Sequence, residues 1–160
     1  MNRILVVGTT LHFWAQEKEI VQKLAASFPG EVVHRPHPRN GGSWQWSAVI
    51  ELKRQLEQAE VVVAAFSTVV IEAALMGVPA ILVAFGNGEQ GQVLEHANYD
   101  HMRDIAKWPS VHVARSLREL TELVRLHLSP VGIDYDRDAM RARALQIANC
   151  EPGIRDRFAD

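Results

Sequence analysis

The sequence has little cysteine and little net charge, and both absences limit what the protein can be. Cys150 is the single cysteine among 160 residues, so no disulfide forms within the chain, which is typical of a reducing compartment. Seventeen basic residues stand against nineteen acidic ones, and this balance supplies no basic field for nucleic acid or anionic lipid. The N-terminal residues lead directly into an apolar run, without a signal-peptide pattern. We therefore expect a cytoplasmic protein that does not bind nucleic acid.

Several motifs that bind or accept phosphate are also missing. No Gly-x-x-x-x-Gly-Lys-Ser/Thr run occurs, which excludes a P-loop. The turn at residues 8–12 lacks the dinucleotide-binding glycines, and residues 64–66 (AAF) offer no aspartate where a phospho-acceptor receiver domain needs one. One literal Gly-x-Gly-x-x-Gly does occur, at residues 86–91, but it follows a later strand and contains Glu89. A nicotinamide or flavin site there stays an alternative.

What the sequence has is one dense apolar stretch, residues 60–85. The stretch is longer than the ~20 residues that a membrane span needs. Glu72 near its middle would nevertheless cost about 3 kcal/mol on insertion scales, and Gly77 and Pro79 would break a helix. We therefore predict no transmembrane segment.

The same stretch predicts a strand, a helix and a second strand. Residues 61–66 form a β-branched apolar run, and residues 80–85 form a second one. Between them, residues 68–76 are good helix formers, with Ser67 at the N-cap position and Gly77 at the end. Both strands are apolar throughout, as buried parallel strands are.

The rest of the chain continues this alternation. Ser116 is a predicted cap, and the helix at residues 48–58 has Val49, Ile50, Leu52 and Leu56 as its inward positions. Further strands are predicted at residues 3–7, 31–35 and 111–114, and further helices at 16–27, 48–58, 91–97, 102–106, 116–128 and 139–149. The pattern predicts one α/β domain over residues 1–160, with a doubly wound, Rossmann-like parallel sheet.

Small and polar residues follow the predicted strands at the edge where such sheets bind ligands. The N–H groups at Ser67 and Thr68 suit a phosphate. Glu72 lies about one turn into the helix, on the face of Thr68, where a carboxylate is placed to accept hydrogen bonds from sugar hydroxyls. The alternative is an ordinary core helix whose Glu72 reaches solvent at the rim.

A second polar cluster, residues 35–39 (RPHPR), follows the second predicted strand. Its two prolines keep the chain extended. With a period of two, Arg35, His37 and Arg39 face the same way, whereas in a polyproline helix they do not. His37 is suited to donating to a phosphate oxygen, and Arg39 to a charge-assisted contact. The alternative is a surface turn whose histidine has no task.

Together these motifs resemble the C-terminal half of GT-B glycosyltransferases, most closely bacterial capsule, polysialic acid and CDP-glycerol polymerase enzymes. Those families carry a His-Pro motif and a downstream Ser-Ser or Ser-Thr pair, followed by an acid within the helix. His37 and Pro38 match the first motif. Ser67 and Thr68 match the second, and Glu72 matches the acid that holds the donor ribose in many of these enzymes.

The likeness extends over nearly the whole chain, from Arg3 to Phe158. Residues 151–157 look like the family's terminal Asp-Gly…Arg signature with the aspartate lost. The N-terminal, acceptor-binding half of such an enzyme has no counterpart in this sequence. The resemblance therefore implies a chain that binds donor but transfers poorly alone, with an acceptor-binding domain or subunit as a partner.

The resemblance also implies a function and a set of site residues. The chain would be the nucleotide-sugar donor-binding domain of an enzyme of surface-polysaccharide synthesis, with His37 as the catalytic residue that stabilises negative charge on the leaving nucleotide. No cofactor and no tightly bound metal are implied; Asp134-Tyr135-Asp136 matches a metal-binding Asp-x-Asp only literally. The implied donor-binding residues are Ser67, Thr68, Glu72, Arg39, Gly8 and Thr9.

Two other interpretations of the sequence stay open. One is a nucleotide-sugar 2-epimerase-like domain, which shares the architecture. The other is a non-catalytic interaction or regulatory module on the same fold. Trp44 and Trp46 would serve either a binding or an interaction role, by stacking a base or covering an interface, and packing in the core is a third possibility for them.

Overall fold

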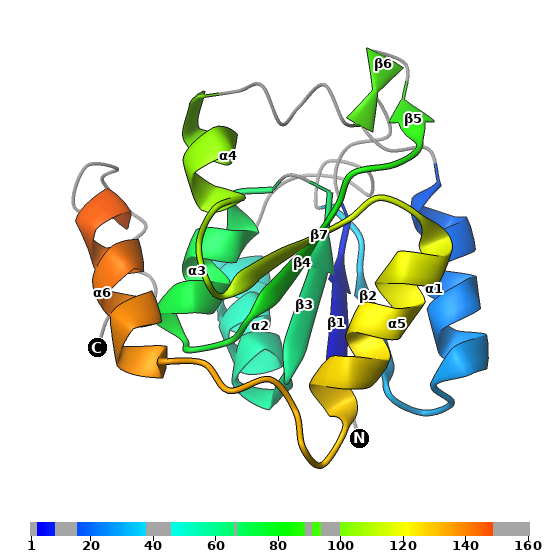
Figure 1. The fold of residues 1–160 in the computed structure, drawn as a ribbon, viewed down its shortest axis with the longest axis horizontal. Coiled ribbons are helices and arrows are strands. Elements are labelled where there is room, and N and C mark those ends of the chain that lie inside the picture. The colour runs from blue at the N-terminus through cyan, green and yellow to red at the C-terminus, as the bar shows by residue number, and fades with distance from the viewer. Residues whose placement is uncertain are drawn as a thin grey trace.

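A five-stranded, all-parallel sheet forms the centre of the fold (Figure 1). The computed structural model describes residues 3–8, 16–37, 46–65, 67–88, 91–93 and 100–148. The strands are β1 (Ile4–Val7), β2 (Val32–Arg35), β3 (Val61–Ala64), β4 (Ala80–Val83) and β7 (Val111–Ala114). All five were predicted from the sequence, and the Rossmann-like α/β fold is confirmed.

The order of the strands across the sheet is β2-β1-β3-β4-β7. Counted along the sheet strands alone, this is the 2-1-3-4-5 order of flavodoxin-like doubly wound sheets. The direction of winding reverses between β1 and β3, and ligands of such sheets bind beyond the carboxyl ends of the strands at that point. The fold therefore places the expected ligand site at the edge where β1 and β3 end, the switch-point edge.

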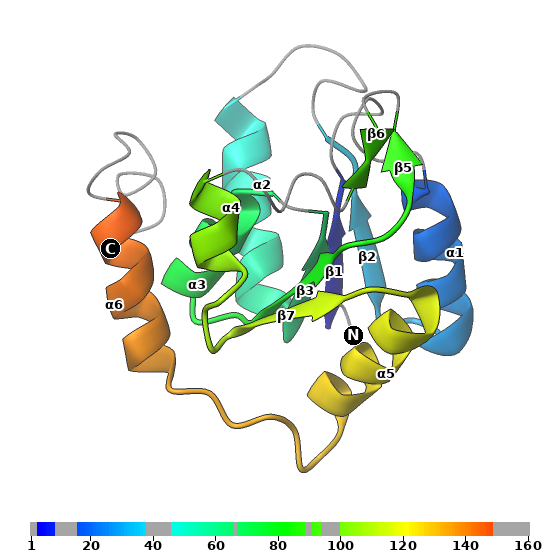
Figure 2. The same ribbon diagram turned by 45° about the horizontal axis from the view of Figure 1, so that its top comes forward.

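Helices cover both faces of the sheet (Figures 1 and 2). On one face α1 and α5 pack against the sheet; on the other lie α2, α3 and α4, with α6 packed outside α3. The helices are α1 (Glu17–Ser27), α2 (Trp46–Gln58), α3 (Val69–Leu75), α4 (Asp100–Ile105), α5 (Leu117–Leu128) and α6 (Arg137–Ala148).

Because helices cover both faces of the sheet, its central strands are apolar throughout. In β1, Leu5 belongs to the core under α2 and α3, whereas Ile4 and Val6 belong to the core under α1 and α5. Successive side chains of a strand point to opposite faces, so a strand covered on both sides needs an apolar residue at every position. All four residues of β1, β3 and β4 are buried accordingly.

Two predictions about the helices are wrong. Ile50 was expected to point inward but is 62% exposed, whereas Leu56 of the same helix is fully buried. A helix was predicted over residues 91–97, but Gly91–Gln92 forms the short strand β6, antiparallel to β5 (Asn87–Gly88). Residues 94–97 lie outside the described ranges.

The hairpin of β5 and β6 also tests whether the Gly-x-Gly-x-x-Gly sequence at residues 86–91 is a dinucleotide-binding motif. A dinucleotide-binding motif needs a helix that begins at its last glycine, so that the pyrophosphate meets the helix N-terminus. Gly91 instead pairs with Gly88 in the two-stranded sheet. The motif therefore matches in sequence but not in structure.

The long apolar stretch is divided as predicted, into β3, α3 and β4. Within the described ranges, no helix is both long enough and apolar enough to span a bilayer.

Candidate functional site

The chain segments that follow β1, β2 and β3 leave the sheet at one edge. In the strand register, Val7 lies beside Arg35 on one side and beside Ala64 on the other. Neighbouring strands are about 4.8 Å apart, so the ends of β2 and β3 are about 10 Å apart across β1. Gly8, His37 and Ser67 each follow one of these ends by one to three residues. The fold thus brings three predicted site residues to the switch-point edge.

Ser67 and Thr68 form the turn into α3. The helix begins at Val69, and Thr68 rather than Ser67 occupies its N-cap position. The prediction of Ser67 as the N-cap is therefore wrong. The Ser67 Oγ accepts from the Val69 N–H at 3.3 Å, and the Ser67 carbonyl accepts from the Val70 N–H. The first amides of α3 are therefore bonded within the turn, and Thr68 is the exposed side chain of the pair.

Glu72 lies in the first turn of α3 and is half-buried. It acts electrostatically on Arg35, the last residue of β2. Burial lowers the pKa of the Arg35 guanidinium, while the carboxylates of Glu51 and Glu72 act in the opposite direction. The Arg35 Nη1 also donates to Gln55 Oε1 at 3.2 Å. Glu72 is therefore close enough to the end of β2 to influence the Arg35 guanidinium.

A carboxylate–imidazole pair, formed by buried Glu17 and half-buried His34, lies at the same edge and was not predicted. Glu17 opens α1, is 6% exposed, and places its Oε1 3.0 Å from His34 Nε2. His34 and Arg35 are neighbours on β2 and so face opposite sides of the sheet, His34 towards α1 and Arg35 towards α2. Each face of the sheet thus has its own polar network beside the switch point.

Gly8 makes room for this pair. A Cβ atom at Gly8 would lie 1.6 Å from Glu17 Oε1, so only glycine leaves the carboxylate in its observed place. The Gly8 N–H donates to the Arg35 carbonyl at 2.8 Å, which continues the pairing of β1 and β2. The sequence signal was available: a glycine ending a strand marks a close approach, but nothing in the sequence identified the group that approaches.

Two hydrogen bonds between Gln16 and Asn87 hold the loop that follows β4. Gln16 Nε2 donates to Asn87 Oδ1 at 2.8 Å, and the Asn87 N–H donates to Gln16 Oε1 at 2.9 Å. Gly86 has φ of +88°, and a Cβ there would lie 2.4 Å from Gln16 Oε1. The loop after β4 is therefore held against the start of α1, on the same edge as Gly8.

His37 lies two residues beyond β2 and is half-buried. Several predictions fall on residues outside the described ranges: Thr9, Pro38, Arg39, Trp44 and residues 151–158, together with the side chain of Trp46. Among the described residues, no group of histidine, cysteine, aspartate or glutamate side chains is arranged to hold a metal ion.

Comparison with known proteins adds no family to this description. No protein-family model matches the chain, and neither a curated protein nor a solved structure is significantly similar to it.

Proposed function

We propose that this chain is the nucleotide-sugar donor-binding domain of a GT-B glycosyltransferase. The observation that carries the proposal is the meeting of Gly8, His37 and Ser67 at the ends of three adjacent strands, at the switch point of a doubly wound sheet. A small residue, an imidazole and a hydroxyl-lined turn at that edge fit an anionic, hydroxyl-rich ligand. The synthesis of a surface polysaccharide is the process that we propose for it.

In the proposed complex the donor diphosphate lies against the turn of Ser67 and Thr68. The exposed Thr68 hydroxyl contacts a phosphate oxygen, and His37 donates to the diphosphate as negative charge develops on the leaving nucleotide. Arg39 adds a charge-assisted contact, and Gly8 and Thr9 border the donor from β1. These groups supply the charge stabilisation, so the proposed reaction uses no metal.

Glu72 accepts hydrogen bonds from the ribose hydroxyls in this proposal. A carboxylate is a stronger hydrogen-bond acceptor than a neutral group, and Glu72 lies in the first turn of α3, beside the proposed position of the donor. Transfer further requires an acceptor-binding domain, which we propose is supplied by another part of the polypeptide or by a separate subunit.

Calorimetric titration with UDP, CDP, CMP and GDP tests the proposal. We expect at least one of the four to bind, and Glu72→Gln to weaken that binding about tenfold, because a hydrogen bond to a charged group contributes about 1.5 kcal/mol or more. Glu57→Gln is the matched control, since Glu57 is an exposed residue of α2. Absence of binding by all four nucleotides, in a sample that circular dichroism shows to be folded, would contradict the proposal.

A further inference from the structure

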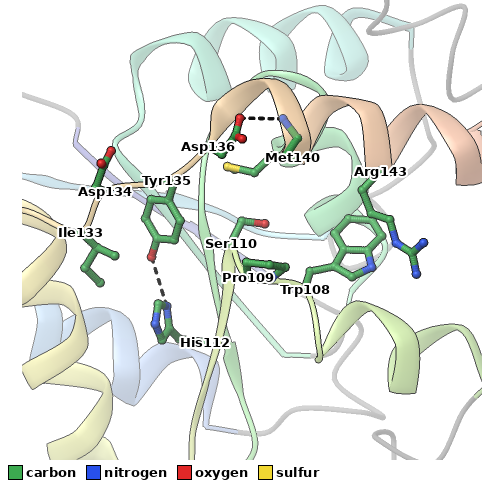
Figure 3. A pocket seen from close by; sticks show the side chains of 11 residues that line it. Trp108, Pro109, Ser110, His112, Ile133, Asp134, Tyr135, Asp136, Met140 and Arg143 are labelled. Atoms are coloured by element: carbon green, nitrogen blue, oxygen red, sulfur yellow. Dashed lines mark hydrogen bonds between the residues drawn. The ribbon is translucent and has the colours of Figure 1, made fainter.

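A cavity of about 210 Å³ lies at the opposite edge of the sheet, near the start of β7 (Figure 3). One wall comes from the segment that enters β7, and the other from the connection between α5 and α6 and from the first turns of α6. The walls are mainly apolar, with Trp108, Pro109, Ile133 and Met140 as large contributors. None of the residues discussed at the switch-point edge lines it, so this is a separate site.

Ser110 supplies a polar group inside this cavity. The residue is 2% exposed, and its backbone carbonyl accepts from the Ala80 N–H. Among the described residues, no hydrogen bond of the Ser110 hydroxyl is found, and Figure 3 shows the hydroxyl directed into the space that Pro109, Met140 and Trp108 surround. The Ser110 Oγ is not among the fully buried side-chain atoms that lack a partner, so it is open to the cavity and to water there. A ligand with one hydrogen-bonding group would replace water as the partner of this hydroxyl.

The left side of the cavity, as drawn in Figure 3, is formed by Tyr135 and His112. The Nδ1–H of buried His127 donates to the Leu123 carbonyl at 2.8 Å, which leaves its Nε2 as an acceptor for the Tyr135 hydroxyl at 2.7 Å. Since that hydroxyl has one proton, His112 Nδ1 at 3.2 Å is the donor to the Tyr135 oxygen. This chain of hydrogen bonds holds the Tyr135 ring as a rigid wall and already satisfies its hydroxyl.

Charge at the cavity disfavours an anion. Asp134 and Asp136 are exposed lining residues. The guanidinium of Arg143 is held 2.8 Å from Asp104, which also accepts from the Trp108 indole N–H at 3.2 Å. Figure 3 shows this guanidinium beyond the Trp108 ring, away from Ser110. The carboxylates therefore set the local field, and a neutral or cationic molecule suits it.

We propose that the cavity binds a small aromatic alcohol or amine. An apolar cavity of about 150 Å³ is large enough to bind benzene, so the larger cavity here accommodates one ring with a short substituent. The ring packs against Trp108 and Met140, and the hydroxyl or amino group bonds to Ser110 Oγ. This inference does not depend on the proposed nucleotide site.

Chemical-shift titration of the full chain with phenol, benzyl alcohol, benzylamine and benzoate tests the inference. We expect saturable shifts at the lining residues for the first three probes, with dissociation constants in roughly the millimolar range for ligands of this size. Benzoate should bind at least about tenfold more weakly, because of the two carboxylates.

Two variants and one control connect any binding to this cavity. Ser110→Ala should weaken binding about fivefold through loss of the hydrogen bond. Ala139→Phe should abolish it, because Ala139 is an exposed lining residue at which a ring fills the cavity without disturbing the core. Ser67→Ala, at the other edge of the sheet, should leave it unchanged.

Three results would overturn the inference. They are the absence of saturable shifts with every probe in a folded sample, equal binding of benzoate and benzyl alcohol, and full affinity in both cavity variants. None of these three results tests nucleotide binding, so the proposed cavity ligand and the proposed nucleotide-sugar donor are tested independently.

Discussion

At the scale of single residues, the carboxylate–imidazole pair of Glu17 and His34 is the feature of the switch-point edge that local sequence patterns do not predict. Sequence reasoning identified the glycine, the serine–threonine turn and Glu72, because each has a local signal such as a strand end or a helix start. It missed the pair because Glu17 resembles any acid in a first helical turn and His34 lies inside a strand. Their contact depends on how α1 packs beside β2, which a local pattern does not contain.

Gly8 offers a direct test of this pair. We expect Gly8→Ala to displace the flexible end of Glu17 from His34 and to lower the free energy of unfolding by about 1–2 kcal/mol, as overpacking does. The same substitution should cost less in a Glu17→Ala background, because the displaced group is then absent. Urea denaturation of the four proteins of this cycle measures the coupling. Additive effects would show that Gly8 and Glu17 do not interact.

At the scale of elements, local chemistry predicted the helices and strands well where caps and uninterrupted patterns were present. β7 has the predicted bounds, and α5 begins directly after its predicted cap, Ser116. The failures lie where a pattern was ambiguous. Ile50 fits the inward spacing of α2 but is exposed, and the glycine-rich segment after β4 forms a hairpin in place of a helix.

The cap of α5 can be tested on its own. Ser116 Oγ accepts from the Glu119 N–H at 3.1 Å, and Glu119 Oε2 accepts from the Arg115 N–H at 2.7 Å. We expect Ser116→Ala to lower the free energy of unfolding by about 1 kcal/mol, whereas Ser116→Asp keeps a capping oxygen and should be close to wild type. Urea denaturation compares the three proteins. Equal losses in both variants would mean that the hydroxyl does not act as a cap.

At the scale of the whole molecule, buried His127 and half-buried His112, which both contact Tyr135, make stability depend on pH. Burial lowers the pKa of His112, and it lowers that of His127, where the Leu123 carbonyl opposes the effect and His112 adds to it. Burial raises the pKa of Tyr135 to about 12, so its hydroxyl remains a donor across the neutral range. The folded protein therefore resists protonation of this cluster.

The sign of the effect follows from linkage. Below the usual histidine pKa, the unfolded chain takes up protons that folded His112 and His127 do not, so the free energy of unfolding falls as pH falls towards their lowered pKa values. Below those lowered pKa values, these two histidines cause no further decrease in the free energy of unfolding. We expect denaturation midpoints to decrease between about pH 7.5 and the acid side of the ordinary histidine range. The decrease in the denaturation midpoint with falling pH should be smaller in His127→Gln. An identical pH dependence in this variant and the wild type would show that His127 does not contribute to it.

The strand order also has a consequence for the order of folding. Of the neighbouring strand pairs, β1 and β3 are the most distant along the chain, and their amino ends are joined by the contact of Arg3 with Glu60, 57 positions away. Closing the longest loop carries the largest entropy cost, so we expect the unit of β1, α1 and β2 to join the remainder of the sheet late. The strand pairing that forms last is then the pairing of β1 with β3 at the switch point. A molecule bound across these two strands would hold together two parts of the sheet that form separately.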